Sequence, residues 1–374
     1  MGAQLGLHRQ APSGERLTTP IAQRSPTDRI SMEEVARRAG VAPSSVSRVL
    51  SGHPNVSEVM RNRVLDAVAA LGYQPDLIAK SLRSGATMTV GFVVGNISNP
   101  LLSEIALGAE TKLQDAGYSM LLTNSMIDAS TDAKNIRLLA QRRVDGMLVS
   151  MTDEESDETR EALSRAGVPL VLVDREVRGV IGAVISSVLA RHEDGITAAV
   201  EHLVSLGHRR IALVNGPTTV RPSRARGAAL RRVARRFGIT AIVRSGQFTA
   251  EHGHLAALAL LTGDDPPSAI IAGSNQILVG VLKAMREAKV RIPDDVSLVT
   301  CDDVPLAQFL DPPLATIQRD HFEIGAMAAE LLLELLGGGT PRVTEVTTTY
   351  RKAASVGPPK RTSDVGHRAS SWNS

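Results

Sequence analysis

Short β-rich runs alternate with amphipathic helical segments over residues 88–318, and this alternation limits the possible folds more than any other feature of the chain. Helical spacing is clear in segments such as 196–206 and 276–288. Strands that alternate with helices pair in parallel, and the helices cover both faces of the sheet. The predicted strands are residues 89–94, 118–123, 146–150, 169–173, 210–214, 242–246, 269–273 and 296–301.

The predicted strands form two sets of about 100 residues, each the size of a domain, so we expect an α/β region of two similar lobes. Ligands in parallel sheets bind at the carboxyl ends of the strands, which here places them in the cleft between the lobes. Residues 319–355 add one long helix pattern, a glycine stop and a threonine-rich strand.

A different pattern fills residues 30–75, where three helices are separated by short polar breaks. Ser31 and Glu34 form a capping box, and Gly40 stands where a left-handed residue ends the first helix. Pro43 is tolerated in the first turn of the second helix, and Ser57 caps the third. Two short helices joined by a tight turn and closed by a third predict an all-α helix-turn-helix domain.

The second of these helices presents small hydroxyls and one arginine outward, namely Ser44, Ser45, Ser47 and Arg48. Small side chains fit between the walls of a DNA major groove, and arginine pairs with O6 and N7 of guanine. The alternative is a serine-rich helix that faces solvent. The absence of Asp and Glu from this helix favours the DNA interpretation.

The formal net charge of +3 is unevenly distributed. Residues 1–87 hold 11 Lys and Arg against 7 Asp and Glu, whereas residues 88–374 hold 31 against 32. A small basic region on a near-neutral body is typical of a polyanion-binding module attached to another domain. An ordinary solvated surface is the alternative that charge alone leaves open.

Several classes of protein are disfavoured by composition. Aromatic residues are 2% of the chain, too few for a stacking platform that binds single-stranded nucleic acid. The single cysteine, Cys301, allows no disulfide within the chain and no cysteine zinc site, and we expect it in the core. The sequence suggests no metal and no cofactor. Apolar runs reach only about 6–9 residues where a membrane span needs about 20, so we expect no membrane partner.

Enzyme signatures are also missing from the sequence. We find no P-loop, no GxSxG and no GxGxxG after a strand, so we expect no catalytic residues and no enzyme activity. His192 and Glu193 are better explained as a helix start than as metal ligands, because HExxH is absent. Residues 1–28 lack the apolar core of a signal peptide, so we expect a cytoplasmic, nucleoid-associated protein with a disordered N-terminal tail.

The order and spacing of these pieces resemble the LacI/GalR family of bacterial transcription regulators. The strongest matches are EVARRAGV (34–41), SVSRVLSG (45–52), NVS (55–57), RVL (63–65), LGYQP (71–75) and AKSLRSG (79–85). Further matches in the body are NISNP (96–100), RVDG (143–146), EHLVSLGHRRIA (201–212) and DPPLAT (311–316). The resemblance extends to about residue 352 and implies that the lobes are similar to periplasmic sugar-binding proteins.

Carried over by position, the resemblance implies that residues 43–50 form the recognition helix and that Arg48 reads a base. Ser31 and Arg61 would contact phosphates, and Leu82 of the hinge helix would wedge into the minor groove. The full set of implied DNA contacts is Ser31, Pro43, Ser44, Ser45, Ser47, Arg48, Asn55, Arg61, Ala79, Leu82 and Arg83. The implied partner is a double-stranded palindromic operator, bound by a homodimer.

The resemblance also implies a pocket for a small effector, a sugar or a related metabolite. The implied ligand-binding positions are Asn96, Leu101, Leu102, Asp174, Arg224, Ser274, Gln276 and Asp302. The aromatic platform that often stacks a sugar ring in this family is not evident in so aromatic-poor a chain. Carboxylates, an arginine and amides around one cleft suit the directional hydrogen bonds of several hydroxyls.

The expected organisation has five parts: a disordered tail (1–28), the helix-turn-helix domain (29–75), a hinge helix and linker (76–87), a two-lobed effector-binding and dimerisation domain (88–355), and a second disordered tail (356–374). The implied function is a sequence-specific regulator, a repressor whose operator affinity a ligand controls. The alternative is a periplasmic-type ligand-binding protein without a DNA-binding role. No heptad run follows the long helix pattern that begins at residue 319, so the C-terminal tetramerisation helix of some family members is not expected, and the resemblance implies a dimer.

Overall fold

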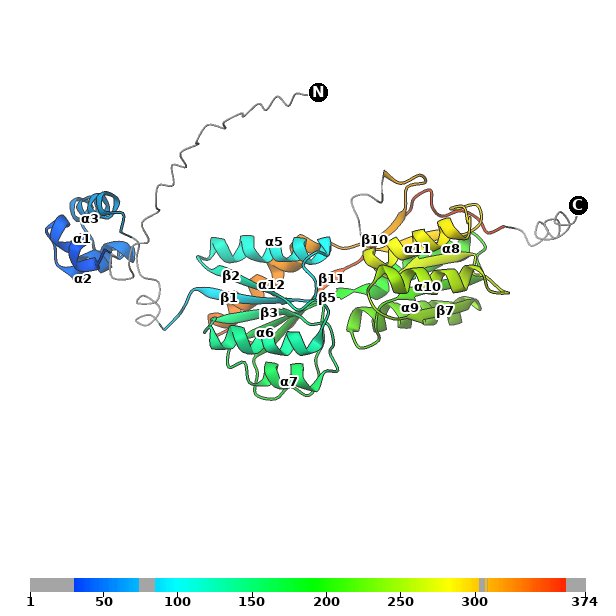
Figure 1. Cartoon of the computed structure of the whole chain (residues 1–374), viewed down its shortest axis with the longest axis horizontal. Coiled ribbons are helices and arrows are strands. Elements are labelled where there is room, and N and C mark those ends of the chain that lie inside the picture. Colours follow the sequence, from blue (N-terminus) through cyan, green and yellow to red (C-terminus); the bar gives the residue numbers. More distant parts are fainter. Residues whose placement is uncertain (1–29, 74–84, 303–306, 308, 361–374) are drawn as a thin grey trace, which may run out of the picture. The chain divides into compact units, whose positions relative to one another are not determined.

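The computed structural model of the chain describes residues 30–73, 85–302, 307 and 309–360 (Figure 1). The chain divides into two compact units, Met1–Arg83 and Ser84–Ser374. The expected hinge residues Ala79, Leu82 and Arg83 and the expected tail at 1–28 lie outside the described residues.

The first unit is a three-helix domain made of α1 (Met32–Ala39), α2 (Pro43–Leu50) and α3 (Glu58–Leu71). The expected capping box is present, since Ser31 Oγ accepts from the Glu34 backbone N–H and the Glu34 carboxylate accepts from the Ser31 N–H at 2.7 Å. Gly40 ends α1 with φ +61°, a conformation that favours glycine. The core contains Val35, Ala36, Ala39, Val46, Val49, Val64, Ala67 and Tyr73. The predicted helix-turn-helix fold is therefore present.

The first lobe of the second unit contains a six-stranded, all-parallel sheet with the order β11-β5-β4-β3-β1-β2. Helices α5 and α12 pack on one face, and α6 and α7 pack on the other (Figure 1). The strands are β1 (Thr89–Val94), β2 (Ser119–Asn124), β3 (Gly146–Ser150), β4 (Leu170–Val173), β5 (Ile185–Arg191) and β11 (Val343–Thr347). The helices are α5 (Pro100–Asp115), α6 (Ala129–Gln141), α7 (Asp157–Ser164) and α12 (His321–Leu336).

The second lobe repeats this arrangement with the order β12-β10-β9-β8-β6-β7, in which only β12 runs antiparallel to its neighbour among the described strands. Helices α8 and α9 cover one face, and α10 and α11 cover the other. The strands are β6 (Arg210–Asn215), β7 (Thr240–Ser245), β8 (Ala269–Ala272), β9 (Ser297–Cys301), β10 (Ala315–Gln318) and β12 (Thr349–Arg351). The helices are α8 (His192–Ser205), α9 (Arg221–Phe237), α10 (Ala250–Leu261) and α11 (Asn275–Glu287).

The chain passes between the lobes after β5, after β10 and after β11, so each lobe contains segments that are distant in the sequence. The crossover strands β5 and β10 were not among the predicted strands. In β5, Ser186 and Ser187 are buried and interrupt the apolar run, and β10 is only four residues long. The long helix α12 belongs to the first lobe, where it meets α5 closely enough that a Cβ at Gly325 would lie 1.9 Å from the Ile105 carbonyl oxygen.

The described part of the second lobe extends to Lys360, past the domain boundary expected at 355. The Gly357 carbonyl accepts hydrogen bonds from His208 Nε2 at 2.8 Å and from Ser297 Oγ at 3.0 Å. These bonds fix the chain beyond the expected boundary, which polar composition alone placed too early. None of the helices in the described ranges combines the length and apolar character needed to cross a membrane.

Candidate functional site

A cavity of about 120 Å³ lies between the lobes, at the carboxyl ends of strands from both sheets. One water needs at least about 10–15 Å³, so the cavity is large enough for a small ligand and not merely for one trapped water. This is the place that the strand pattern predicts for a ligand in a parallel α/β fold.

Seven of the eight expected ligand positions line this cavity. They are Asn96, Leu101, Leu102, Asp174, Ser274, Gln276 and Asp302. Asn96, Leu101 and Leu102 surround the start of α5, and Ser274 and Gln276 surround the start of α11. The structure therefore brings together residues that are up to 206 positions apart in the sequence.

Arg224 is the exception, because it is not among the residues that line the cavity. Its Nη2 donates to Glu154 Oε2 at 2.6 Å, and the Glu154 side chain is only 2% exposed. Arg226, two residues further along α9, lines the cavity instead. Its Nη1 donates to the Gly273 carbonyl at 2.7 Å, and its Nη2 lies 3.9 Å from Asp302. Because the two residues point to different sides of α9, Arg226 and not Arg224 lines the cavity.

The two aspartates of the cavity occupy equivalent places in the two lobes. Asp174 directly follows β4 and Asp302 directly follows β9, the third strand from the same edge of each sheet. Both have left-handed backbone, with φ +52° and φ +73°, a region that aspartate enters more readily than most residues. Both side chains are buried.

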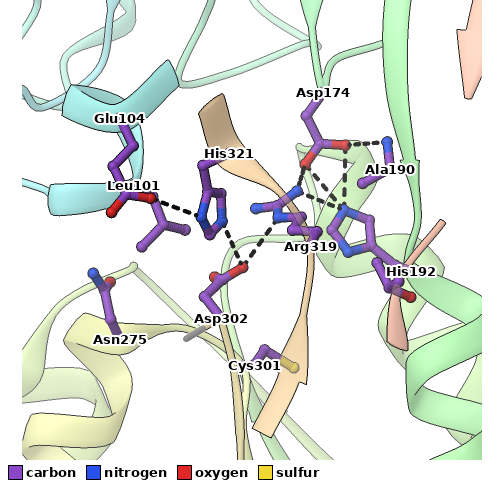
Figure 2. A network of polar contacts seen from close by, with 12 residues as sticks. Leu101, Glu104, Asp174, Ala190, His192, Asn275, Cys301, Asp302, Arg319 and His321 are labelled. Atoms are coloured by element: carbon purple, nitrogen blue, oxygen red, sulfur yellow. Dashed lines mark hydrogen bonds and ion pairs between the residues drawn. The ribbon is translucent and has the colours of Figure 1, made fainter. Parts of the chain in front are cut away.

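A single guanidinium connects these carboxylates, as Figure 2 shows. Arg319 Nη1 donates to Asp174 Oδ2, and Arg319 Nε donates to Asp302 Oδ1 at 3.1 Å. Arg319 directly follows the crossover strand β10, so its position is determined by the strand that leads into the other lobe. The two lobes therefore share one buried ion-pair network.

Two histidines extend the network in an equivalent way. His192 is the first residue of α8 and its Nε2 lies 3.0 Å from Asp174 Oδ2. His321 is the first residue of α12, with Nε2 3.5 Å from Asp302 Oδ1 and Nδ1 3.3 Å from Glu104 Oε2 (Figure 2). Each histidine begins the helix that follows a crossover strand, and the predicted helix start at His192 is confirmed.

Burial and charge act in opposite directions on the pKa values of this network. Burial alone would raise the pKa of Asp174, but His192 and Arg319 hold it well below its usual range. Burial also opposes ionisation of Asp302, and Arg319 outweighs it and lowers that pKa. Burial lowers the pKa of His192 to about 4. At neutral pH the network therefore contains charged aspartates, a charged arginine and a neutral His192.

Further polar contacts join the lobes beside the cavity. Asn275 Nδ2, at the start of α11, donates to Asn99 Oδ1, the cap of α5, at 2.8 Å. Elsewhere, Glu154 of the first lobe accepts from the Arg221 N–H at 2.9 Å and from Arg224. The lobes are thus closed around the cavity by side chains that do not need a ligand.

The sequence reasoning missed several residues of this site: Arg226, Phe248, Asn275, Arg319 and the two histidines as partners of the aspartates. Phe248 supplies an aromatic ring at the cavity, packed so closely on Gly216 that a Cβ there would lie 2.2 Å from the ring. A signal for Phe248 existed, because it follows the predicted strand 242–246 at its carboxyl end. No local pattern marked Arg319.

The expected DNA-contacting side chains of the first unit lie on its surface. Pro43, Ser44 and Arg48 of α2 are exposed, whereas Ser45 and Ser47 are partly covered. Val46 and Val49 of the same helix are buried, so the helix has one core face and one free face. Ser31 and Asn55 are also exposed, and Arg61 is partly exposed. The first unit therefore exposes one face of a helix that contains no acidic residue.

A helix-turn-helix unit and a two-lobed unit with a ligand-sized cavity, present in one chain, define a ligand-controlled DNA-binding regulator. Residues 31–76 match the family model for bacterial regulatory proteins of the lacI family, and residues 200–354 match that for a periplasmic binding protein-like domain. The ribose operon repressor of Escherichia coli (strain K12) is 33% identical over 326 residues, which is 86% of this chain and 95% of that protein.

The HTH-type transcriptional repressor PurR of Photobacterium profundum is 30% identical over 306 residues, 81% of this chain and 91% of that protein. The crystal structure of the Lac repressor dimer bound to operator and the anti-inducer ONPF matches with a TM-score of 0.76 and 26% identity, over 87% of this chain and 99% of that chain. The chain belongs to the LacI family of bacterial transcriptional repressors, with a periplasmic-binding-protein-like effector domain. These relatives are repressors, not enzymes, and the expected fold class is confirmed.

Proposed function

We propose that this repressor binds a palindromic operator as a homodimer and that a small polar metabolite in the interlobe cavity controls its affinity for DNA. The observation that carries the proposal is the cavity itself, lined by polar groups of both lobes in a chain that also has a DNA-binding unit. A ligand that contacts both lobes couples to their relative position, because it stabilises the arrangement in which both sets of contacts form. Such a protein acts on chromosomal DNA in the cytoplasm.

The DNA-reading surface in this proposal is the free face of α2. Arg48 reads a guanine through a bidentate pair, while Ser44, Ser45 and Ser47 allow close approach to the groove. Ser31 and Arg61 contact phosphates, which positions the helix without reading sequence. Pro43 and Asn55 contribute at the ends of this surface, and Ala79, Leu82 and Arg83 contribute from the hinge.

The size and lining of the cavity favour an effector of monosaccharide size. A cavity of about 120 Å³ suits a small ligand such as a monosaccharide. Asn96, Ser274 and Gln276 supply hydrogen-bonding groups, and Phe248 supplies a ring face for an apolar side of the ligand. A purine base has a similar size, so binding of adenine or hypoxanthine instead of a sugar is the alternative outcome.

The homodimer in this proposal forms through the effector unit. Both lobes expose large apolar side chains on neighbouring elements: Leu107 on α5, Leu121 on β2, Phe322 on α12, Leu255 on α10 and Val279 on α11. A dimer buries such side chains, and twofold symmetry matches a palindromic site. Sedimentation equilibrium should show a dimer for the natural chain and a monomer for L121R, with the secondary structure retained by circular dichroism.

The decisive experiment for the function as a whole combines DNA and ligand. The DNA site is first selected from random duplexes with the full chain, and its binding is followed by fluorescence anisotropy. D-ribose, other pentoses, hexoses and purine bases are then added one at a time. We expect one of these classes to change the operator Kd by about 5-fold to 150-fold, the usual range of allosteric coupling. Failure to select any DNA sequence would refute the regulator function.

A further inference from the structure

The charges that line the interlobe cavity do not balance. Among the described residues, the charged lining side chains are three arginines and two aspartates: Arg175, Arg226, Arg319, Asp174 and Asp302. Arg319 is bonded to both aspartates, so these carboxylates are already compensated within the protein (Figure 2). Arg226 lies at 3.9 Å from Asp302 and shares the same carboxylate. One positive charge is left over.

Arg175 carries this remaining charge. Its Nε donates to the Met151 carbonyl at 2.5 Å and its Nη1 donates to the Asp174 carbonyl at 2.8 Å, so both partners are neutral backbone oxygens. Within the described ranges, no carboxylate lies at ion-pair distance from its guanidinium, and no hydrogen bond uses its Nη2. The two carbonyl bonds hold the side chain in place and leave part of its donor fork available.

The acidic side chains near Arg175 are engaged elsewhere. Asp174 binds His192 and Arg319, and the Glu154 carboxylate binds Arg224 together with two backbone N–H groups. Asp132 Oδ2 accepts from the Thr152 N–H at 2.7 Å and from the Thr152 hydroxyl at 2.6 Å. Recruiting Asp174 or Glu154 to Arg175 would break these bonds, and Asp132, whose Oδ1 is buried without a hydrogen-bond partner among the described residues, forms no ion pair with Arg175. The described part of the chain therefore supplies no carboxylate that is ion-paired with Arg175.

The helix ends at the cavity favour the same sign of charge. The cavity is lined by the amino-terminal residues of α5, which has 16 residues, and of α11, which has 13. The first N–H groups of both helices bond to capping oxygens of Asn99, Ser274 and Asn275, so it is the helix dipole that favours an anion at these ends. The guanidinium of Arg175 and the dipoles of the two helices therefore favour negative charge in the same cavity.

We propose that the effector carries an anionic group, a carboxylate or a phosphate, that binds the guanidinium of Arg175 in the interlobe cavity. This inference rests on the proposed function and makes it more specific. The ligand class is an acidic monosaccharide derivative or a sugar phosphate of similar size, not a neutral sugar or a neutral base. The planar fork of arginine suits the oxygens of either group through charge-assisted hydrogen bonds.

The primary experiment measures anion binding to the full chain without DNA. Inorganic phosphate is titrated into the protein by isothermal titration calorimetry, in chloride buffer of constant ionic strength. We expect saturable binding of one phosphate per chain, weakened at least tenfold in R175Q and unchanged in R178Q. Arg178 is an exposed arginine on the same loop and loses the same charge, so it is the matched control. R175K keeps the positive charge but lacks the planar guanidinium, so it should bind phosphate more weakly than the natural chain does.

The outcomes separate clearly. Absence of saturable phosphate binding, or an equal loss in R178Q, overturns the proposal. If R175Q does not fold, the comparison of R175K, R178Q and the natural chain still tests the proposal. Equal phosphate affinity in all three proteins, without one saturable site per chain, overturns it.

Sugar probes then identify the source of the anion and separate this inference from the proposed function. D-ribose, D-ribonate and D-ribose 5-phosphate are compared by calorimetry, and we expect one of the two anionic probes to bind at least tenfold more tightly than D-ribose. Equally tight binding of D-ribose overturns the anion proposal but leaves ligand control of DNA intact. If phosphate binds at Arg175 but no metabolite changes operator affinity, the proposed control of DNA binding is refuted and the anion site remains.

Discussion

Asp174 and Asp302 occupy equivalent positions at the carboxyl ends of β4 and β9, one in each lobe, and both form ion pairs with the same guanidinium of Arg319. This relationship places a charged network where the crossover strands leave each lobe. Any movement of one lobe against the other has to preserve or break these bonds. The network is therefore central to both the stability of the effector unit and its response to a ligand.

Replacing Arg319 should destabilise the effector unit strongly. The R319Q variant leaves two buried carboxylates without this counterion, and breaking a buried pair in this way costs about 3–5 kcal/mol. Urea unfolding followed by circular dichroism measures the loss. R165Q removes an exposed ion pair with Glu161 and should change little. A loss in R319Q no larger than in this control would contradict the role of the network.

His192 should make the stability of the effector unit depend on pH. Its pKa is about 4 in the folded protein and about 6.5 in the unfolded chain. Because the unfolded chain takes up the proton first, stability contributed by neutral His192 is complete above pH 6.5 and is lost as the pH falls towards 4. The natural chain should lose about 3 kcal/mol more than H192Q between pH 7 and pH 4. Parallel pH profiles for the two proteins would exclude this effect.

Glu154 and Arg224 should be energetically coupled across the lobes. E154Q, R224Q and the double variant form a double-mutant cycle, and we expect a coupling free energy of about 1–2 kcal/mol because the two side chains contact each other directly. Chemical denaturation of the four proteins gives the four corners of the cycle. Additive effects would show that Arg224 has its main partner elsewhere, as its expected role in ligand binding implies.

Arg48 should determine base preference in the operator. R48A removes the bidentate base contact that we propose for Arg48 and should weaken specific binding by about 1–3 kcal/mol, with relaxed preference at one position in each half-site. Selection from random DNA detects the change of preference directly. R38A, another exposed arginine of the first unit, is the control and should keep the selected motif. An unchanged motif for R48A would assign base reading to another residue.

Leu82 should contribute to operator binding without contributing to ligand binding. The L82A variant removes the side chain that we propose opens a base step in the minor groove, so specific DNA affinity should fall. Ligand affinity, measured by calorimetry, should stay the same because the cavity is not altered. If L82A binds the operator as tightly as the natural chain does in a gel-shift assay, Leu82 does not act as a wedge.

Local signals in the sequence were sufficient for the helix-turn-helix unit. Ser31, Gly40 and Ser57 begin or end its helices through bonds to residues only three or four positions away, so the sequence window contains both partners. The alternation of β-rich and helical segments likewise predicted parallel sheets in two lobes. It failed at β5 and β10, because buried serines and short length obscure a strand that only sheet neighbours stabilise.

The candidate site was predicted only in part. Seven ligand positions could be placed by resemblance to a family, because they follow strand ends or begin helices that the pattern also locates. The choice of Arg226 over Arg224 depends on which side of α9 faces the cavity and on the presence of Glu154, which comes from the other lobe. A sequence motif that fixes spacing does not determine such a direction.

The amino-acid sequence by itself determined the two kinds of domain through short-range periodicity and capping, and its resemblance to a family determined the class of protein and seven positions that line the cavity. Tertiary structure alone decided the charge state of the cavity. Arg319 and Asp174 are separated by 145 residues and meet only because the chain crosses between the lobes before and after β10. Electrostatic balance depends on distances in space, so the pairing of Arg319 and the lack of a carboxylate partner for Arg175 among the described residues could be recognised only once both lobes were folded together.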